Sequence, residues 1–482
     1  MKLDEDQIAS IVRRVAARLG DNGGGAAKAE TPSPGVADIE PLGIYGSVNE
    51  AVAAAKVSYA ALEDMPLMRR AAIIESMRAA ARAGARRQAE LAVEETALGN
   101  ARDKLTKNLL AINKTPGVEA LSPVAYTGDD GIALMERAPY GVIGSITPCT
   151  NPTATVVNNA IGMIAAGNAV VFNAHPLAKQ VTNRIISLLN HAIVAAEGPA
   201  NLLTAVSPPT IESAQELMRH PDVRLLVVTG GPGVVKAAMA SGKRCIAAGP
   251  GNPPAVVDQT ANLDEAARHL VDGASFDNNI VCVVEKEILC VESVAARLMD
   301  EMAKCGAHIL SSSELAKIEK LVIGRAPSGP GDHGQINKDW VGKDAVKILA
   351  AIGSRAPEGT RLLIFNAPAD HPLVIMEQLM PVTPVVKVKC VNSGIELAQE
   401  VEHGFLHTAV MHSTNVDNLS HMARVVNTSI FVKNGPSVAG LGYGGEGYTS
   451  FTIASPTGEG LTCARHFTRE RRCTLKDRFR II

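Results

Sequence analysis

The sequence predicts an α/β protein built on parallel β-sheets, and three observations support this prediction. Short segments rich in Val, Ile and Leu alternate with longer segments of helical periodicity, which is typical of parallel strands joined by helices. Clusters of glycine, proline and asparagine separate the segments, as turns require. Aromatic residues make up only 3% of the chain, so aliphatic side chains must fill the cores.

Length and composition restrict the class of protein. A chain of 482 residues can bury large cores and should form two or more domains. Hydrophobic residues make up 46% of it and charged residues 20%, which is typical of a globular protein. The net charge of −2 and the lack of a long basic run argue against nucleic acid as a partner. No apolar run is long enough to cross a bilayer, and residues 1–6 are not signal-like, so we expect no membrane span.

The cysteines indicate neither a metal site nor a disulfide framework. They lie at positions 149, 245, 282, 290, 305, 390, 463 and 473. No two of them form a Cys-x-x-Cys pair, so we expect no bound metal and a reducing compartment.

The first 38 residues have the composition of a helix on a tether. Residues 1–20 are predicted to form an amphipathic helix, because apolar side chains recur on one face at helical spacing. Residues 21–38 are rich in glycine and proline and are predicted to be a flexible linker. The apolar stripe needs the main body, a groove of another protein or a membrane surface to cover it. The glycine run favours a separate protein partner, since docking within the chain rarely needs such a tether.

The remaining elements follow in order. A helical region is predicted over 48–113 and a hairpin arm over 126–137. Strands are predicted at 141–146, 169–172, 201–206 and 223–229, with helices at 155–166, 178–196 and 211–219. A strand at 255–257 leads to a second α/β unit over 263–432, with strands at 281–291, 360–365, 382–391 and 408–412. The tail, 461–482, is predicted to be a strand that pairs with another element, in this subunit or another; a basic patch is the alternative.

A glycine turn follows the predicted strand 223–229. It reads Thr229-Gly230-Gly231-Pro232-Gly233, and a helix is predicted to begin at Val234. A strand, a glycine turn and a helix N-terminus together can receive a pyrophosphate on free backbone N–H groups. The turn is not a Gly-x-Gly-x-x-Gly motif, so an ordinary tight turn is an equally good interpretation of this stretch alone.

An amide-rich turn over 275–279 runs into an apolar segment, with Cys282 at the junction. A thiolate is the strongest side-chain nucleophile near neutral pH, and such a turn can expose it to a substrate. The alternative is that Cys282 is a small buried hydrophobic residue.

Several motifs carry a resemblance to a known family. Thr147–Pro152, Gly249–Pro254 and Asn278–Cys282 resemble the aldehyde dehydrogenase superfamily, and specifically its CoA-acylating branch, the propionaldehyde and acetaldehyde dehydrogenases of bacterial microcompartments. Further matches lie at 95–99, 402–409, 458–462 and 467–472. The resemblance extends over nearly the whole chain from about Ile39.

The resemblance implies a domain organisation. It implies a Rossmann-type cofactor-binding domain made of 39–121 and 136–250, and an α/β catalytic domain made of 251–445. Residues 122–135 and 465–482 would form a small β arm for oligomerisation, giving a homodimer or homotetramer. Residues 1–20 resemble the encapsulation peptides that bind shell proteins, which implies a place inside a microcompartment of the bacterial cytoplasm.

The resemblance also implies the chemistry. Cys282 would attack the aldehyde carbon, and the tetrahedral oxygen would be stabilised by the Cys282 N–H and by a donor from the 148–152 loop. Matching the prolines places Thr150 in register with the family's Asn, but we prefer Asn151, since an amide N–H₂ is a better donor. The alternative for Asn151 is a turn residue before proline. After hydride leaves for the nicotinamide, a thioester remains on Cys282.

One departure from the hydrolytic relatives is informative. They carry a Glu general base at the position that Ala248 occupies, and nothing acidic lies between Cys245 and Val257. Without a base to activate water, the thioester should persist until CoA attacks it. We therefore predict the conversion of propanal or acetaldehyde, CoA and NAD⁺ to acyl-CoA and NADH. The alternatives are a hydrolytic aldehyde dehydrogenase and an inactive microcompartment interaction protein.

The resemblance assigns the cofactor contacts. The phosphate turn would comprise Thr229, Gly230, Gly231 and Gly233. Glu377 matches the ribose-binding Glu of the family; the alternative is a solvent-facing helix carboxylate.

The adenosine end of the predicted cofactor site is less determined by sequence. Where relatives have a Lys, this chain has Asn173-Ala174-His175-Pro176. His175 faces adenosine or caps a turn, and the choice between NAD and NADP is left open. His407 and Thr408 either lie near the site or only fill the core, and Cys149 is expected to be structural.

Overall fold

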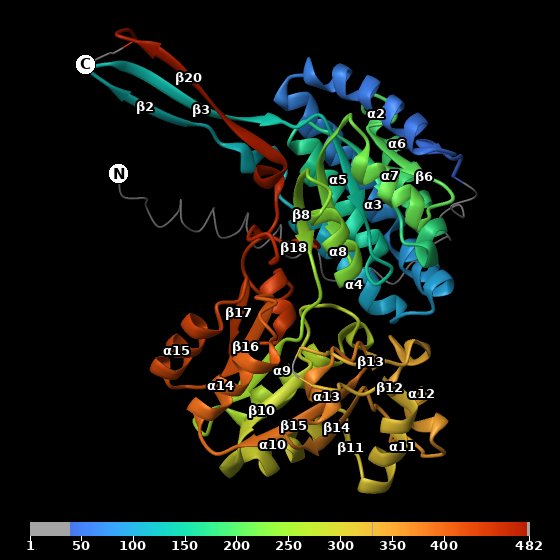
Figure 1. The fold of residues 1–482 in the computed structure, drawn as a ribbon, viewed down its shortest axis with the longest axis vertical. Helices are drawn as coiled ribbons and strands as arrows, with labels where there is room; N and C mark the ends of the chain where they lie inside the picture. Colours follow the sequence, from blue (N-terminus) through green and yellow to red (C-terminus); the bar gives the residue numbers. More distant parts are fainter. Residues whose placement is uncertain (1–38, 330, 480–482) are drawn as a thin grey trace, which may run out of the picture. The chain divides into compact units, whose positions relative to one another are not determined.

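Two parallel sheets organise the chain. The structure is a computed structural model that describes residues 39–329 and 331–479 (Figure 1). The predicted N-terminal helix (1–20) and linker (21–38) lie outside the described residues. From Pro41 onward the described residues belong to one unit.

The first sheet has six strands in the order β1-β6-β5-β4-β7-β8, all parallel. The strands are β1 Ile44–Tyr45, β4 Val142–Ile146, β5 Ala169–Asn173, β6 Leu203–Val206, β7 Val223–Thr229 and β8 Arg244–Ala248. The helices are α2 Val48–Glu63, α3 Leu67–Thr96, α4 Ala101–Lys114, α5 Pro152–Ala165, α6 Lys179–Ala195, α7 Ile211–Arg219 and α8 Pro232–Met239. The chain adds β5 and β6 on one side of β4 and then β7 and β8 on the other. Such a switch point opens a crevice at the carboxyl ends of the strands, where α/β proteins bind ligands.

The second sheet has seven parallel strands in the order β11-β14-β15-β10-β9-β16-β17. The strands are β9 Pro254–Val257, β10 Glu287–Val291, β11 Ala307–Ile309, β14 Leu362–Ala367, β15 Val382–Val388, β16 Thr408–His412 and β17 Ile430–Lys433. The helices are α9 Leu263–Ala274, α10 Glu292–Lys304, α11 Ser312–Val322, α12 Ala345–Ala351, α13 Pro372–Ile375, α14 Val391–Val401 and α15 Val416–Val426. Two small strand pairs complete it: β12 Ile323–Arg325 with β13 Gln335–Ile336, and β18 Ile453–Ala454 with β19 Gly460–Leu461.

Helices cover both faces of this second sheet. On one face α9 and α10 pack against β10, with Leu270 and Leu298 fully buried. On the other face α14 and α15 pack against Leu289, through Ile395 and Met422. The parallel α/β architecture predicted from the alternation of segments is confirmed.

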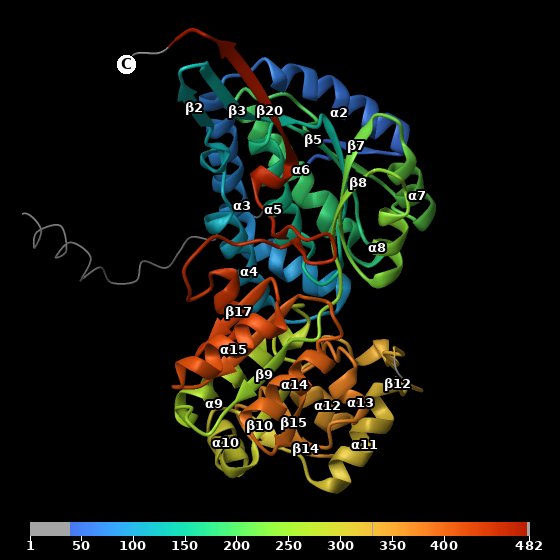
Figure 2. The same ribbon diagram turned by 60° about the vertical axis from the view of Figure 1, so that its left-hand side comes forward.

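A third, antiparallel sheet forms an arm that extends away from the first sheet in both views (Figures 1 and 2). It comprises β2 Val124–Gly128, β3 Gly131–Pro139 and β20 Thr468–Lys476, in the order β2-β3-β20. The hairpin and the strand predicted in the tail are thus both present, and β20 pairs with β3 of the same chain. Every residue of β2, and all of β20 except Thr468, is exposed.

The predicted strand 281–291 is wrong in its first half. Residues 280–284 form turns, and β10 begins only at Glu287. Val281, Val283 and Val284 are buried on all sides, and apolar sequence alone does not distinguish a buried turn from a buried strand. The predicted strand 382–391 also ends earlier, at Val388, because Cys390 is the N-cap of α14.

Two further features concern the residues that the structure describes. None of their helices has the length and apolar character that crossing a membrane requires. Nor do they bring three or more His, Cys, Asp or Glu side chains together in a way that suits a metal ion.

The core under the first sheet should be sensitive to cavities. Helix α5 is buried on every side, and Ile161 in its middle has no exposed surface. We expect Ile161→Ala to lower the free energy of unfolding by about 2–5 kcal/mol, because the lost methyl groups leave a void. Circular dichroism during chemical unfolding measures the loss. Val57→Ala is the control, because the Val57 side chain on α2 is exposed. It should change stability by less than about 0.5 kcal/mol.

Candidate active site

A cleft of about 600 Å³ lies where the carboxyl ends of β4, β5 and β7 face the loop that carries Cys282. All of the site residues predicted from sequence line it: Asn151, His175, Thr229, Gly230, Gly231, Gly233, Cys282 and Glu377. They come from segments far apart in the chain, so the fold brings them together. The cleft therefore joins the glycine turn of the first sheet to the cysteine loop of the second.

The loop before Cys282 is held in an unusual backbone conformation. Asp277, Asn278 and Asn279 have φ angles of 45°, 55° and 66°, in the left-handed region that Asn and Asp tolerate better than other non-glycine residues. Their side chains also fix the turn. The Asn278 amide donates to Gly342 O at 2.9 Å, and the Asn279 amide donates to Ala274 O at 2.8 Å. The amide-rich sequence is thus the local reason for a rigid turn that presents Cys282.

A buried lysine closes the far end of this loop. Lys286 Nζ donates to Asn279 O at 2.8 Å and to Asn279 Oδ1 at 2.6 Å. Burial lowers the pKa of Lys286 to about 8. The adjacent Glu285 is also buried, and it accepts the N–H and hydroxyl of Ser437, each at 2.7 Å. Both ends of the cysteine loop are therefore anchored by buried polar contacts.

The environment of Cys282 disfavours its charged form. Burial raises the pKa of the Cys282 thiol to about 12, and the Glu377 carboxylate raises it as well. Lys286 and Lys107 act in the opposite direction. The Cys282 thiol is therefore neutral near pH 7.

The second loop of the site lies before α5 and carries Thr150 and Asn151. Both residues line the cleft. Asn151 Nδ2 donates to Thr150 Oγ1 at 3.1 Å, and Lys107 Nζ donates to Asn151 Oδ1 at 2.6 Å. Thr150 Oγ1 accepts this bond and keeps its own O–H, and the Asn151 amide keeps its second N–H. Both residues therefore retain a donor for a ligand in the cleft, and the orientation of the Asn151 amide is set by the buried Lys107.

The glycine turn has the geometry of an anion site. β7 ends at Thr229, α8 begins at Pro232, and no side chain caps this helix. A Cβ added at Gly231 or Gly233 would meet nothing within 4 Å, so open space lies over the helix N-terminus. Free N–H groups and open space together suit a pyrophosphate. The turn is better suited to a ligand than an ordinary strand–helix connection would be.

Glu377 is not a solvent-facing helix residue. Helix α13 ends at Ile375, and Glu377 lies in the following loop, where it lines the cleft and accepts the Gly251 N–H. Burial raises the pKa of its carboxyl. Of the described residues that line the cleft, only Glu377 carries a carboxylate. The predicted alternative for Glu377 is therefore wrong. The residues just after β8 that line the cleft are Gly249 and Pro250, which bring no acid to it.

His175 both caps a turn and borders the cleft. Its Nδ1 accepts the Leu177 N–H at 3.2 Å, at the start of a short 3₁₀ helix, Pro176–Ala178. Burial lowers the pKa of His175, so the ring is neutral near pH 7. Asn173, in the same stretch, accepts the Ser213 hydroxyl at 2.6 Å. The two interpretations of His175 are compatible.

His407 is buried beside the cysteine loop rather than in the cleft wall. A Cβ added at Gly251 would crowd both the Cys282 carbonyl and the His407 ring. His407 Nδ1 lies 2.9 Å from the Thr408 hydroxyl, and no partner for Nε2 is found among the described residues. Burial lowers the pKa of His407 to about 4, so the ring is neutral. Cys149 packs against an apolar cluster of Ala92, Ala178 and Val181 and also lines the cleft.

Sequence reasoning missed the charged residues that support the site. Lys104 and Lys107 are buried on α4, Asp277 is buried at the start of the cysteine loop, and Lys286 is buried behind it. A usable signal was present, because Lys104 and Lys107 are spaced i,i+3 on the face of α4 that also carries Ala111. Their partners are distant in sequence, so the pattern alone does not identify them.

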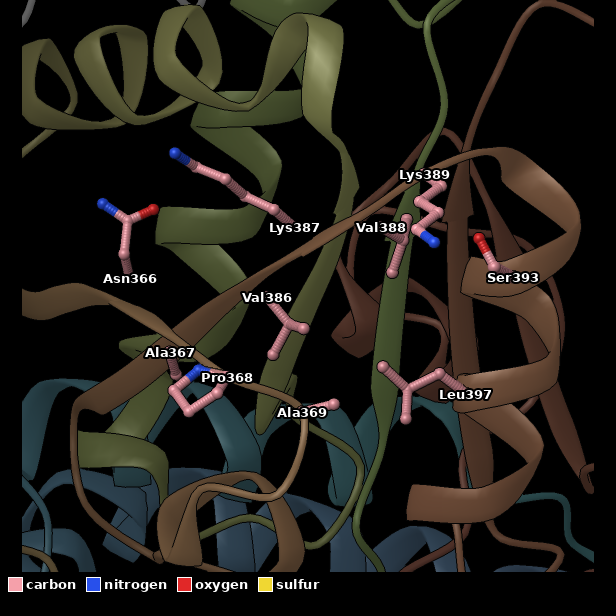
Figure 3. Close-up of a pocket in the computed structure, with 10 residues that line it drawn as sticks. All are labelled: Asn366, Ala367, Pro368, Ala369, Val386, Lys387, Val388, Lys389, Ser393 and Leu397. Atoms are coloured by element: carbon pink, nitrogen blue, oxygen red, sulfur yellow. The ribbon is translucent and has the colours of Figure 1, made fainter.

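A second hollow, of about 610 Å³, lies elsewhere in the second sheet (Figure 3). It is lined by the ends of β14 and β15 and the start of α14, and includes Val386, Lys387 and Leu397. None of the predicted site residues lines it. The predicted site residues therefore gather in the first cleft alone.

Comparison with known proteins agrees with this geometry. The family model described as "Aldehyde dehydrogenase family" matches residues 41–316. The chain belongs to the aldehyde dehydrogenase family.

The similar relatives narrow the branch. The chain is 48% identical over 481 residues to "Acetaldehyde dehydrogenase (acetylating) EutE" of Salmonella typhimurium, covering 100% of both proteins. It is 43% identical, with a TM-score of 0.88, to a propionaldehyde dehydrogenase from the fucose utilisation bacterial microcompartment of Clostridium phytofermentans, covering 92% of this chain and 100% of that one. Rhodopseudomonas palustris propionaldehyde dehydrogenase with bound CoA and an acylated cysteine is 45% identical, with a TM-score of 0.87, covering 90% and 98%. The predicted resemblance to the CoA-acylating branch is confirmed.

The influence of Glu377 on the nucleophile is testable in the free protein. Glu377→Gln should lower the pKa of Cys282, because it removes a negative charge that disfavours the thiolate. At mildly alkaline pH, iodoacetamide should then alkylate Cys282 several-fold faster than in the wild type, as measured by mass spectrometry. The matched control is Glu358→Gln on the surface. An alkylation rate that is unchanged or slower in Glu377→Gln would contradict the assignment.

Proposed function

We infer that the protein is a CoA-acylating, NAD-dependent aldehyde dehydrogenase. It converts a short aldehyde, propanal or acetaldehyde, with CoA and NAD⁺ to acyl-CoA and NADH through a thioester on Cys282. The observation that carries this inference is a single cleft holding a cysteine nucleophile and an open helix N-terminus, with an alanine where a hydrolytic base would stand.

The first half of the reaction uses Cys282 and its two neighbouring donors. The Cys282 sulfur bonds to the aldehyde carbon, the thiol proton leaves to solvent or a neighbouring base, and the carbonyl oxygen becomes an oxyanion. The Cys282 N–H and the Asn151 amide donate hydrogen bonds to that oxygen. Their geometry is set before substrate arrives, because both loops are anchored by buried contacts.

The cofactor residues are assigned on the same cleft. Thr229, Gly230, Gly231 and Gly233 form the phosphate turn, where N–H groups and open space meet a diphosphate. Glu377 holds a ribose hydroxyl, and His175 borders the adenosine. When bound, the nicotinamide accepts the hydride that the tetrahedral carbon releases, and a thioester is left on Cys282.

The second half transfers the acyl group to CoA. The CoA sulfur bonds to the thioester carbon, the bond to Cys282 breaks, and the two thiols exchange the acyl group and one proton. Water competes poorly, because it needs a base and the cleft is lined after β8 by Gly249 and Pro250, which are not acids. Glu377 is the one carboxylate of the cleft wall among the described residues, and it already accepts the Gly251 N–H.

Domain roles and assembly follow from the same reasoning. We assign 39–121 and 136–250 to cofactor binding, 251–445 to catalysis, and 122–135 with 465–482 to an oligomerisation arm. The exposed edge strands β2 and β20 support that role, since an unpaired edge is a ready surface for a second copy. A homodimer or homotetramer is the expected assembly.

The proposed location is a microcompartment in the bacterial cytoplasm. The chain is similar to a dehydrogenase from such a compartment, and residues 1–20 have the pattern of a helix that binds a protein groove. Residues 1–20 would address the enzyme to a shell protein. This targeting role would be independent of catalysis, because residues 21–38 have the composition of a flexible linker.

The CoA requirement tests the proposed function. With propanal and NAD⁺, NADH formation should need CoA for steady turnover and should vanish in Cys282→Ala, because the thioester then cannot form. Absorbance of NADH is the measurement. Cys390→Ala, at an exposed site remote from the cleft, is the matched control. Steady turnover without CoA that yields free propanoate would favour the hydrolytic alternative, and an inactive wild type that still binds NAD⁺ would favour the interaction protein.

Deleting residues 1–20 tests whether they are needed for targeting to the shell but not for activity. We expect the truncated enzyme to keep its turnover and to lose recovery with shell proteins when the two are co-expressed. Co-purification followed by the NADH assay measures both. Loss of folding in the truncated chain, or undiminished recovery with shells, would refute the role of residues 1–20 as an address.

A further inference from the structure

We propose that Lys107 is a positioning residue that orients the Asn151 amide toward the oxyanion and that Asp277 holds Lys107 in place. A buried acid–lysine–amide relay thereby joins the nucleophile loop to the oxyanion loop. The proposal rests on the proposed function in one respect, the use of the Asn151 amide as an oxyanion donor.

The relay is continuous in the structure. Lys107 Nζ forms a salt bridge with Asp277 Oδ2 and donates to Asn151 Oδ1 at 2.6 Å. The side chains of Lys107 and Asp277 are 2% and 0% exposed, so solvent does not compete for these bonds. Asp277 lies on the same loop as Cys282, whereas Asn151 precedes α5. One lysine thus connects the two parts that must meet around the substrate.

The ammonium group decides which way the amide faces. Lysine donates hydrogen bonds and accepts none, so only the oxygen of Asn151 can face it. The N–H₂ group must then face the opposite way, where one N–H reaches Thr150 Oγ1 and the other is left for a ligand. Flipping the amide would place two donors against each other in a buried site, which is costly.

The Asn151 side chain does not cap its own helix. It is the N-cap residue of α5, a position where Asn usually accepts a backbone N–H of its own helix. Here the side chain makes no capping bond, because its oxygen is bonded to Lys107. A purely structural asparagine at this position would be expected to cap the helix.

Asp277 is fixed from several directions. Its Oδ1 accepts the Asn100 N–H at 2.8 Å, and its own N–H donates to Asp103 Oδ2 at 2.8 Å. A Cβ at Gly99 would collide with the same carboxylate, so only glycine permits this close approach. Because Asp277 is fixed, the ammonium group of Lys107 that pairs with it is fixed as well. Lys107 also lies near enough to favour the thiolate of Cys282.

Lys104 provides a matched control on the same helix. It is also buried and lies 3.2 Å from the same Asp277 oxygen, but it donates to the Thr150 backbone carbonyl at 3.0 Å rather than to Asn151. Lys104→Met should therefore destabilise the fold about as much as Lys107→Met while leaving the amide oriented.

The test compares Lys107→Met, Asn151→Ala and the double variant with the wild type. Loss of an oxyanion donor lowers the rate by about 100- to 1000-fold, and Lys107→Met should lower kcat by at least about tenfold with the KM for NAD⁺ unchanged. The double variant should be no slower than Asn151→Ala, because Lys107 acts through that amide. Lys104→Met should lower kcat by a clearly smaller factor than Lys107→Met, because it leaves the bond between Lys107 and Asn151 in place.

Three outcomes overturn the inference: independent losses that multiply in the double variant, equal losses of kcat in Lys104→Met and Lys107→Met, or a change in KM alone. An inactive wild type would instead defeat the proposed function. A high-resolution crystal structure of Lys107→Met then still tests the relay, since the Asn151 side chain should lose its wild-type orientation once the bond to Lys107 is gone. An Asn151 side chain in its wild-type orientation in Lys107→Met would overturn the inference in that case.

Discussion

The buried carboxylate of Asp277 is the contact on which the rest of the site depends. It lies at the start of the left-handed turn before Cys282, and two lysines and a backbone N–H converge on it. Removing one partner of a buried ion pair commonly costs about 3–5 kcal/mol, since the remaining charge is left uncompensated. The pair is weak evidence for net stability, but it gives the two loops one relative arrangement. Specific geometry, rather than additional stability, is what this cluster contributes.

The surroundings of Cys282 explain the state of its thiol. A partly buried thiol at a pKa of about 12 is a poor nucleophile at rest, yet it lies among lysines that favour its thiolate. Catalysis through such a group requires the site to change when it fills, by bringing charge, dipoles or a proton acceptor near the sulfur. Glu377, Lys286 and Lys107 carry the charges that act on this thiol, so their charge states can take part in that change.

Much of this site was predictable from sequence, and the reason is local. Asn151 lies at the start of a helix, the 229–233 turn follows a strand, and Cys282 follows an amide-rich turn, so turn residues mark all three positions. The roles proposed for them came from the family resemblance. The alternation of segments also predicted both sheets. The contacts of Lys107 with Asp277 and Asn151 were not predictable, because these residues are far apart in sequence and only the tertiary fold brings them together. The start of β10 was missed for a related reason, since Val281–Val284 has the apolar character of a strand but is buried as a turn.

The arm has a consequence for the order of events during synthesis. Its middle strand, β3, is made early, but its partner β20 follows more than three hundred residues later, with Met135 opposite Arg472. The ribosome must therefore finish both α/β units before the three-stranded sheet can exist. Until then β2 covers one edge of β3 and the other edge is open. The arm is therefore the last of the three sheets that the chain can complete.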